Sequence, residues 1–178
     1  MKQLSKYGGL TKMVWARNGT PDTLTSAGTE LLISDLTSTI FNTLLTHVIF
    51  VTSFVQPGLQ LGNGSIDTGT NYAARFSYDG ATDTTVTTQP YILFQSDTSP
   101  LWDQFAVQYS FNISAEEKLV ISNNIGGNTV GAGNAPHRQE VVGKWSNTSN
   151  QFDQVKNDDV SCGTNYDTDS QLSMLSTD

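Results

Sequence analysis

The stretch from residue 105 to residue 113 limits the fold more than any other part of the chain. Apolar side chains occupy every second position and polar or small ones lie between them: Phe105, Val107, Tyr109, Phe111 and Ile113 against Ala106, Gln108, Ser110 and Asn112. A period of two residues is that of a β-strand with two unlike faces. The alternation therefore predicts a strand whose apolar set, Phe105 to Ile113, points inward.

Short strand-like runs separated by turn signals continue along the rest of the chain. They cover residues 30–34, 40–55, 59–61, 72–78, 91–94, 119–121, 140–145, 152–155 and 172–175. The 40–55 run also has apolar residues at helical spacing, but its branched, aromatic and threonine content favours strands. Asp79-Gly80 predicts a tight turn, and residues 115–118 predict a single helical turn. About eight or nine strands without a long helix predict an all-β, jelly-roll-like β-sandwich.

The two ends of the chain differ in charge. Lys2, Lys6, Lys12 and Arg17 are four of the nine basic residues, and they precede the first acid, Asp22. With 178 residues the chain has room for one domain with a proper core. We expect an extended basic N-terminal arm over residues 1–20 and a β-sandwich domain over residues 21–178. The arm is either a solvated tail or a segment that binds an acidic neighbour, including another copy of the chain.

The net charge of −8 disfavours binding to nucleic acid. No stretch is apolar enough for a membrane-spanning helix, and the start Met-Lys-Gln-Leu lacks the apolar segment of a signal peptide. Cys162, the single cysteine, excludes an intrachain disulfide. These features predict synthesis in the cytoplasm, without a membrane or nucleic-acid partner.

Residues suited to catalysis are sparse. His47 and His137 are the two histidines, and neither has a second histidine near it in sequence. There is no Gly-x-Ser-x-Gly motif, and the Gly-x-Gly fragments do not open a helix after a strand. Acid pairs at 79 and 83, at 158 and 159, and at 167 and 169 are either solvated or suited to calcium. The sequence predicts a protein that is not an enzyme and that holds no cofactor or metal.

Tryptophans are candidates for contact with a partner. Trp145 alternates with polar neighbours on a predicted strand and is expected in the core. Trp102 follows Ser99-Pro100-Leu101 in a predicted loop. It is therefore the best candidate for contact with a ligand such as a sugar, with a place in the core or a subunit interface as the alternative.

Three segments carry a family resemblance. They are TGTNYAARFS at residues 68–77, NISAEEK at 112–118 and GAGNAPHRQEVVGKWSNTS at 131–149, the last being the most specific. In this order they resemble jelly-roll-like virion structural proteins of tailed phages and environmental viruses, of the capsid-decoration or fibre type. The resemblance covers about residues 60–178, and the last strands are only loosely similar.

The resemblance implies a virion structural protein of the capsid decoration or cement type. The basic charge of the N-terminal region then makes it the segment expected to attach to the capsid shell or a tail part, with Lys2, Lys6, Lys12, Trp15 and Arg17 as contact residues. The resemblance also implies a homotrimer located in the virion. The alternative is a carbohydrate-binding module or fibre adhesin on the virion surface that uses Trp102.

Overall fold

The computed structural model describes residues 14–50, 56–94, 103–127, 130–160 and 166–178. These residues form thirteen strands, all paired antiparallel, and contain no helix. The predicted all-β, jelly-roll-like sandwich is confirmed, with more strands than the eight or nine expected. None of the described residues belongs to a helix that has the length and apolar character to cross a membrane.

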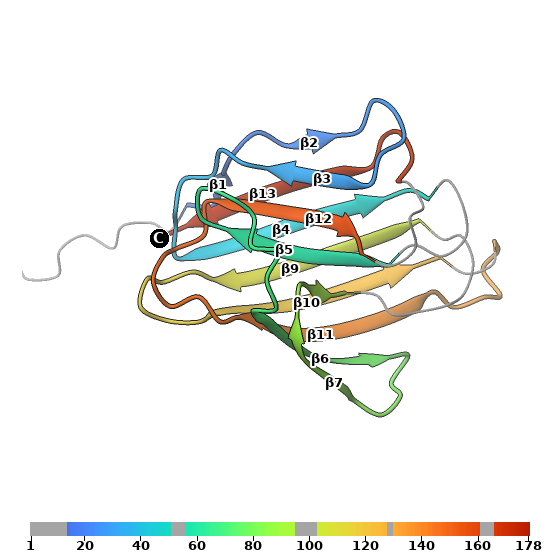
Figure 1. The fold of residues 1–178 in the computed structure, drawn as a ribbon. Helices are drawn as coiled ribbons and strands as arrows, with labels where there is room; N and C mark the ends of the chain where they lie inside the picture. Colours follow the sequence, from blue (N-terminus) through green and yellow to red (C-terminus); the bar gives the residue numbers. More distant parts are fainter. Residues whose placement is uncertain (1–13, 51–55, 95–102, 128–129, 161–165) are drawn as a thin grey trace, which may run out of the picture.

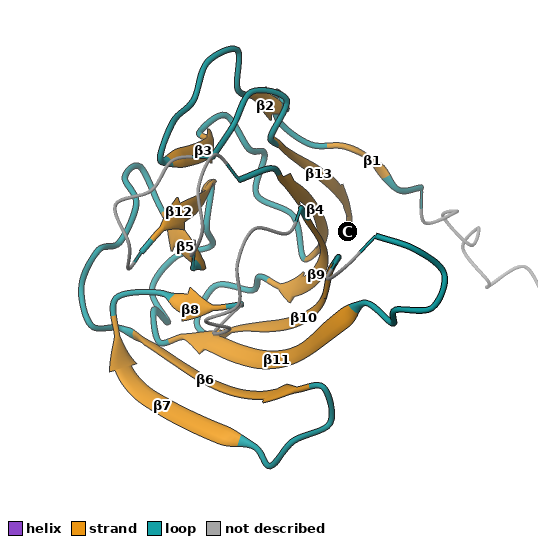
Figure 2. Cartoon of the chain, turned by 90° about the vertical axis from the view of Figure 1, so that its right-hand side faces the viewer, coloured by secondary structure: helices purple, strands orange, loops and turns teal. Residues whose placement is uncertain are grey.

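Two sheets make the sandwich, and the chain passes repeatedly between them (Figure 1). The large sheet runs β1 (Ala16–Arg17), β13 (Gln171–Thr177), β4 (Phe41–Val48), β9 (Gln104–Phe111), β10 (Lys118–Gly126), β11 (His137–Trp145), β6 (Tyr72–Tyr78) and β7 (Thr84–Gln89), with β2 (Asp22–Thr23) also on β13. The small sheet runs β3 (Glu30–Ile33), β12 (Gln154–Asp159), β5 (Pro57–Gly62) and β8 (Ile92–Leu93). Figure 2 shows the large sheet curving around the small one, so that the large sheet has a sheltered inner face and an open outer face.

The core lies between the sheets. Each small-sheet strand contributes almost completely buried apolar residues: Leu31, Ile33, Leu59, Leu61, Ile92 and Val155. On the large sheet, Trp145 and Tyr72 are each 1% exposed and stack with ring centroids 6.4 Å apart. Gly143 is required where β8 meets β11, because a Cβ at this position would lie 2.7 Å from a methyl group of Ile92. Trp145 is thus in the core, as its alternation predicts.

Strand β9 has the predicted period but the opposite orientation. Phe105 and Tyr109 are 46% and 50% exposed, whereas Gln104 and Gln108 are buried in the sandwich. The expectation that the aromatic set points inward is therefore wrong. The register places Tyr109 beside Ile121 of β10, and both face outward. The apolar half of β9 thus joins apolar side chains of the neighbouring strand on the outer face.

Residues 115–118 do not form the predicted helical turn. Residues 115–117 lie in a non-helical turn between β9 and β10, in which Ala115 has a positive φ of 69°, and Lys118 begins β10. Asp79-Gly80 does form the predicted tight turn, with φ values of 47° and 79°. This left-handed backbone suits Asp and Gly at a hairpin between β6 and β7.

Candidate assembly surface

Outward-facing apolar side chains of five large-sheet strands lie side by side. The register aligns Leu175 of β13, Thr43 of β4, Tyr109 of β9, Ile121 of β10 and Val142 of β11 in one row across the sheet. A second row aligns Phe41, Phe111 and Leu119. We call this surface the outer apolar face; its members are Phe41, Leu45, Phe105, Val107, Tyr109, Phe111, Leu119, Ile121, Ile125, Val142 and Leu175.

Large apolar residues on this face are open to solvent to an unusual degree. Leu119, Ile121, Ile125 and Val142 are each 50–54% exposed. Single exposed apolar residues are common on protein surfaces, but a contiguous patch marks an interaction site. These residues are neighbours through the strand register, so they form one patch.

A hollow lies at the β1 end of the outer apolar face. It has a volume of about 350 Å³ and is lined by Trp15, Phe41, Asn42, Tyr109, Ser110, Phe111, Leu119 and Ile121. The rings of Phe41 and Phe111 have centroids 6.1 Å apart and a tilted arrangement. The hollow has the size and lining to receive an apolar side chain.

Charged residues are missing from most of this face. The outward positions of β13, β4, β9 and β10 hold no Lys, Arg, Asp or Glu among the described residues. Their titratable side chains are His47, which is exposed on β4, and Tyr109. A neutral apolar centre of this kind is typical of the core of a protein–protein interface.

Charges begin at β11 and form one rim of the face. The Lys144 ammonium lies 2.8 Å from the Glu117 carboxylate, and Arg138 lies 3.9 Å from Glu140. These groups are solvent-exposed, so each pair contributes at most about 1 kcal/mol to stability. The rim thus bounds the apolar region rather than stabilising the fold.

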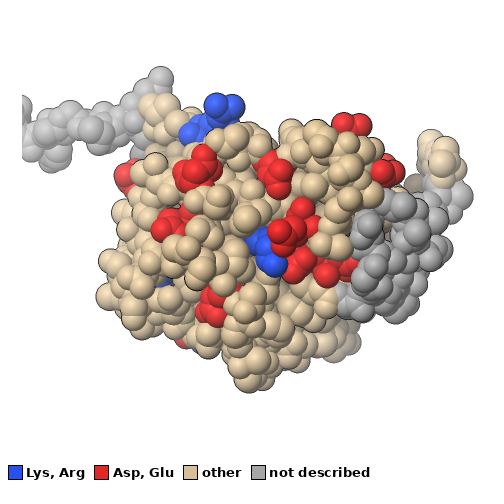
Figure 3. Space-filling view, turned by 45° about the horizontal axis from the view of Figure 1, so that its top comes forward, with Lys and Arg blue, Asp and Glu red and all other residues tan. Residues whose placement is uncertain are grey.

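The small-sheet side of the molecule has the opposite character. Acidic side chains are spread over this side, with few basic ones (Figure 3). Lys156 lies 2.8 Å from Asp158 and 3.3 Å from Glu30. Burial alone would lower the pKa of Lys156, but its contacts with these two carboxylates outweigh burial and raise it. The small sheet thus carries acidic pairs on its outside, whereas the large sheet carries the outer apolar face with Glu117 and Glu140 at its rim.

Two of the predicted arm residues lie beside the outer apolar face. Trp15 is 46% exposed and lines the hollow, and Arg17 in β1 pairs with Leu175 of β13. Lys2, Lys6 and Lys12 lie outside the described residues, as do Trp102 and Cys162. Of the predicted 1–20 arm, Ala16–Arg17 thus form an edge strand of the large sheet.

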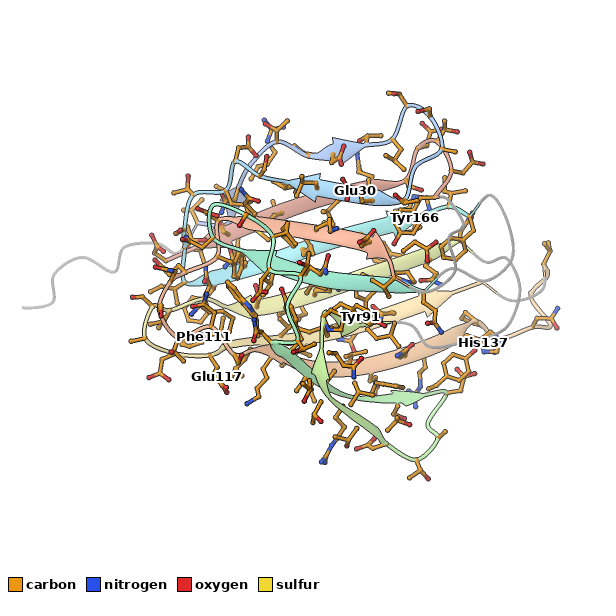
Figure 4. All side chains as sticks on the ribbon, viewed as in Figure 1. Glu30, Tyr91, Phe111, Glu117, His137 and Tyr166 are labelled. Atoms are coloured by element: carbon orange, nitrogen blue, oxygen red, sulfur yellow. The ribbon has the colours of Figure 1, made fainter. Side chains whose placement is uncertain are left out.

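His137 contacts a carboxylate at the far end of β11. Its Nδ1 lies 2.5 Å from Oδ2 of Asp79, and the ring of Tyr78 stacks on it. The Arg138 amide donates to Asp79 and is the largest influence that lowers the pKa of this carboxyl. Figure 4 shows His137 at the opposite end of the sheet from Phe111 and Glu117. These contacts fasten the β6–β7 turn to β11.

Metal ligands do not gather in the described part of the chain. No group of three or more His, Cys, Asp or Glu residues with suitable geometry occurs among the described residues. A second, polar hollow of about 340 Å³ lies beside Trp145, where Asn63, Ser65, Asp67, Thr68, Asn147 and Asn150 line it. Its carboxylate is already engaged, since Asp67 accepts hydrogen bonds from Trp145 Nε1 at 2.7 Å and from Asn71 at 2.9 Å.

Comparison with known proteins gives no relative. No family model matches the chain, and no curated protein and no solved structure matches it significantly. The fold and its surface thus define a β-sandwich with one open apolar sheet face.

Sequence reasoning missed the outer apolar face. A signal was present in Leu119-Val120-Ile121, because three successive apolar residues in a strand indicate that both of its faces are covered. Val120 is 2% exposed in the core, while Leu119 and Ile121 are 53% and 54% exposed. The outer face of β10, with Leu119 and Ile121, is therefore expected to be covered by another molecule.

Proposed function

We propose that this chain is a structural protein that works by assembly, as a virion component of the capsid decoration or cement type. One observation carries the proposal: the outer apolar face, a contiguous and mostly uncharged patch on five strands. An exposed patch of this kind is unfavourable in a lone soluble protein and is retained where a partner covers it.

The assignment to a virion rests on the resemblance of residues 68–77, 112–118 and 131–149 to jelly-roll-like virion proteins. The position of the N-terminal segment supports attachment through it. Trp15 and Arg17 lie at the edge of the outer apolar face, so residues that precede them start from that side of the molecule. Lys2, Lys6 and Lys12 would then bind an acidic groove of the shell by charge complementarity.

Co-sedimentation with capsids tests this function. Capsids without their decoration layer, from the virus that encodes the chain, are mixed with the full chain or with a variant that lacks residues 2–13. The deletion keeps β1, which begins at Ala16. We expect the full chain to pellet with capsids and the deletion variant to remain in the supernatant.

A charge-reversal variant makes the test sharper. Lys2→Glu, Lys6→Glu and Lys12→Glu in one chain should abolish pelleting, whereas Lys144→Glu, a reversal on the rim of the body, should leave it intact. If the full chain does not bind capsids at low salt, a capsid-decoration role is wrong. If the triple variant binds as well as the full chain, attachment through the arm is wrong.

The polar hollow beside Trp145 favours a carbohydrate-binding role as the second candidate. Amide and hydroxyl groups line it, and such groups hydrogen-bond to sugars. A glycan array with the full chain and an Asn147→Ala, Asn150→Ala variant tests it. Binding that this variant loses would favour the adhesin function, and the absence of any glycan bound by the full chain would exclude it.

A further inference from the structure

We propose that the outer apolar face packs against the same face of a second copy of the chain, so that the protein is a two-fold symmetric dimer of sandwiches. The proposal rests on the assembly function above and names the partner of the face. Sheets that pack face to face lie about 10 Å apart with their strands within about 30° of each other. The dimer would therefore have four layers, with the two large sheets in the middle.

The composition of β9 is the first argument that this face is buried in the working protein. Its outward residues are Phe105, Val107, Tyr109 and Phe111, whereas its inward residues are Gln104, Ala106, Gln108 and Ser110. The strand thus directs its more apolar half away from the core of the monomer. Obligate interfaces between identical subunits have this character, because they resemble a domain core divided between two chains.

The area of the face suits a stable dimer. Five strands about 4.8 Å apart, with about eight residues each at about 3.4 Å per residue, cover about 24 Å by 27 Å, or on the order of 650 Å². A standard interface buries about 800 Å² on each partner. Specific interfaces range down to about 600 Å² on each partner, so the face lies at the lower end of the size that a specific dimer needs.

The charge distribution allows identical copies to meet at this face. Each copy has a net charge of −8, so most orientations of two copies bring like charges together. The outward positions of β13, β4, β9 and β10 hold no charged residue, while Glu30, Asp158 and other acids lie on the small-sheet side. Face-to-face packing places the two acidic sides farthest apart.

The rest of the described surface favours contact between the outer apolar face and the same face of a second copy. Packing against a different patch of a second copy would require another apolar patch. Among the described residues, the exposed large apolar residues outside this face are Val14 and Trp15, which lie beside it, and Val130 in the loop before β11. A patch that meets its own equivalent is related to it by a two-fold axis, which gives a dimer rather than the trimer that the family resemblance implies.

The oligomeric state of the purified full chain tests the proposal without any capsid. Sedimentation equilibrium and light scattering at up to about 100 μM should give twice the monomer mass, within the range of a specific homodimer. Ile121→Glu places a charge in the central row of the face and should weaken association by roughly 100-fold or more. Ser26→Glu adds the same charge on an exposed loop between β2 and β3 and should leave the dimer intact.

Ile121→Thr serves as a second variant that keeps a β-branched strand residue. It should weaken the dimer by roughly 10-fold without disturbing the fold. Circular dichroism of each variant checks that the sandwich persists. A wild-type monomer at the highest concentration, a trimer, or a dimer that tolerates Ile121→Glu would each overturn the proposal. A dimer that does not bind capsids would support face-to-face dimerisation and reject the capsid function. A monomer that binds capsids would support the capsid function and reject the dimer.

Discussion

At the scale of single residues, the carboxylate of Asp67 connects the loop after β5 to the core through hydrogen bonds. Its oxygens accept hydrogen bonds from Trp145 Nε1, from Asn71 and from the Gly69 amide. Burial alone would raise the pKa of Asp67, but these three donors outweigh it and hold the pKa below the ordinary value of 3.8. The ionised carboxylate is thus preferred in the folded protein.

Asp67→Asn is expected to destabilise the protein by about 2 kcal/mol at neutral pH, since hydrogen bonds to charged groups contribute about 1.5–3 kcal/mol. Because the folded-state pKa is lowered, the carboxylate stabilises the fold above its unfolded pKa, and this contribution is lost as pH falls through the folded value. Urea unfolding at about pH 7, 5 and 3 should show the difference between wild type and variant narrowing below about pH 4. Asp83→Asn, at an exposed position, is the control; an equal loss there would contradict the assignment.

The side chain of Tyr72 hydrogen-bonds to the backbone of β5, as a neighbouring strand would. Its hydroxyl accepts from the Leu61 amide at 3.0 Å and lies 2.9 Å from two carbonyl oxygens, those of Leu61 and Asp67. Tyr72→Phe leaves the buried Leu61 amide without this acceptor, which costs about 1–3 kcal/mol. Hydrogen exchange should quicken at Leu61, whereas Tyr109→Phe on the outer face should leave Leu61 unchanged. Unaltered exchange at Leu61 in Tyr72→Phe would show that the hydroxyl is dispensable.

At the scale of the strand, periodicity predicts that a strand forms but does not predict which of its two faces points into the core. The alternation of residues 105–113 predicts a strand with two unlike faces, and β9 is such a strand. An apolar half faces inward in a monomeric sandwich, but the same half faces outward when an interface covers the outside. The sequence of β9 alone carries no mark that separates these two cases, and the mark that exists lies in Leu119-Val120-Ile121 of the neighbouring strand β10. The outer apolar face was for this reason not predicted, although β6 and β11 have their expected faces.

The inward-facing side chains of β9 include a buried polar group that lowers the free energy of unfolding. Gln108 is 2% exposed, and neither its Nε2 nor its Oε1 has a hydrogen-bond partner among the described residues. Its register neighbours are Leu44 of β4 and Ser122 of β10. Gln108→Leu replaces a buried amide with an apolar group of similar size, so we expect the free energy of unfolding to rise by about 1–2 kcal/mol.

Thermal and urea unfolding of Gln108→Leu checks this orientation of β9. Gln171→Leu, at an exposed outward position of β13, is the matched control and should leave the unfolding free energy within about 0.5 kcal/mol of wild type. A loss of stability in Gln108→Leu would indicate that the amide has partners in solution and that the polar half of β9 belongs inside for that reason.

The strands that sequence analysis missed are those with the weakest apolar signal. Strand β7 reads Thr-Thr-Val-Thr-Thr-Gln and is mostly exposed at the edge of the large sheet, so packing does not determine its composition. Strands β1 and β2 have two residues each and exist through pairing with β13, which is distant in sequence. Edge strands of this kind depend on tertiary partners that local pattern does not contain.

For the whole molecule, the separation of surfaces decides how copies approach one another. An acidic chain repels its copies over long range, and the outward positions of β13, β4, β9 and β10 offer contact without opposing charges. Association through this face would be driven by the burial of apolar area. Association through the basic arm and an acidic neighbour would instead be driven by attraction between charges.

Salt separates these two kinds of contact within one protein. Raising NaCl from about 50 mM to about 500 mM shortens the Debye length from about 14 Å to about 4 Å and screens repulsion between the acidic copies. We therefore expect the self-dissociation constant, measured by sedimentation velocity, to stay constant or decrease by a few fold. Capsid binding through Lys2, Lys6 and Lys12 should weaken by at least tenfold over the same range, because it depends on attraction between unlike charges. If salt instead dissociated the self-association and left capsid binding unchanged, the charged rim would hold the copies together and the apolar face would hold the shell.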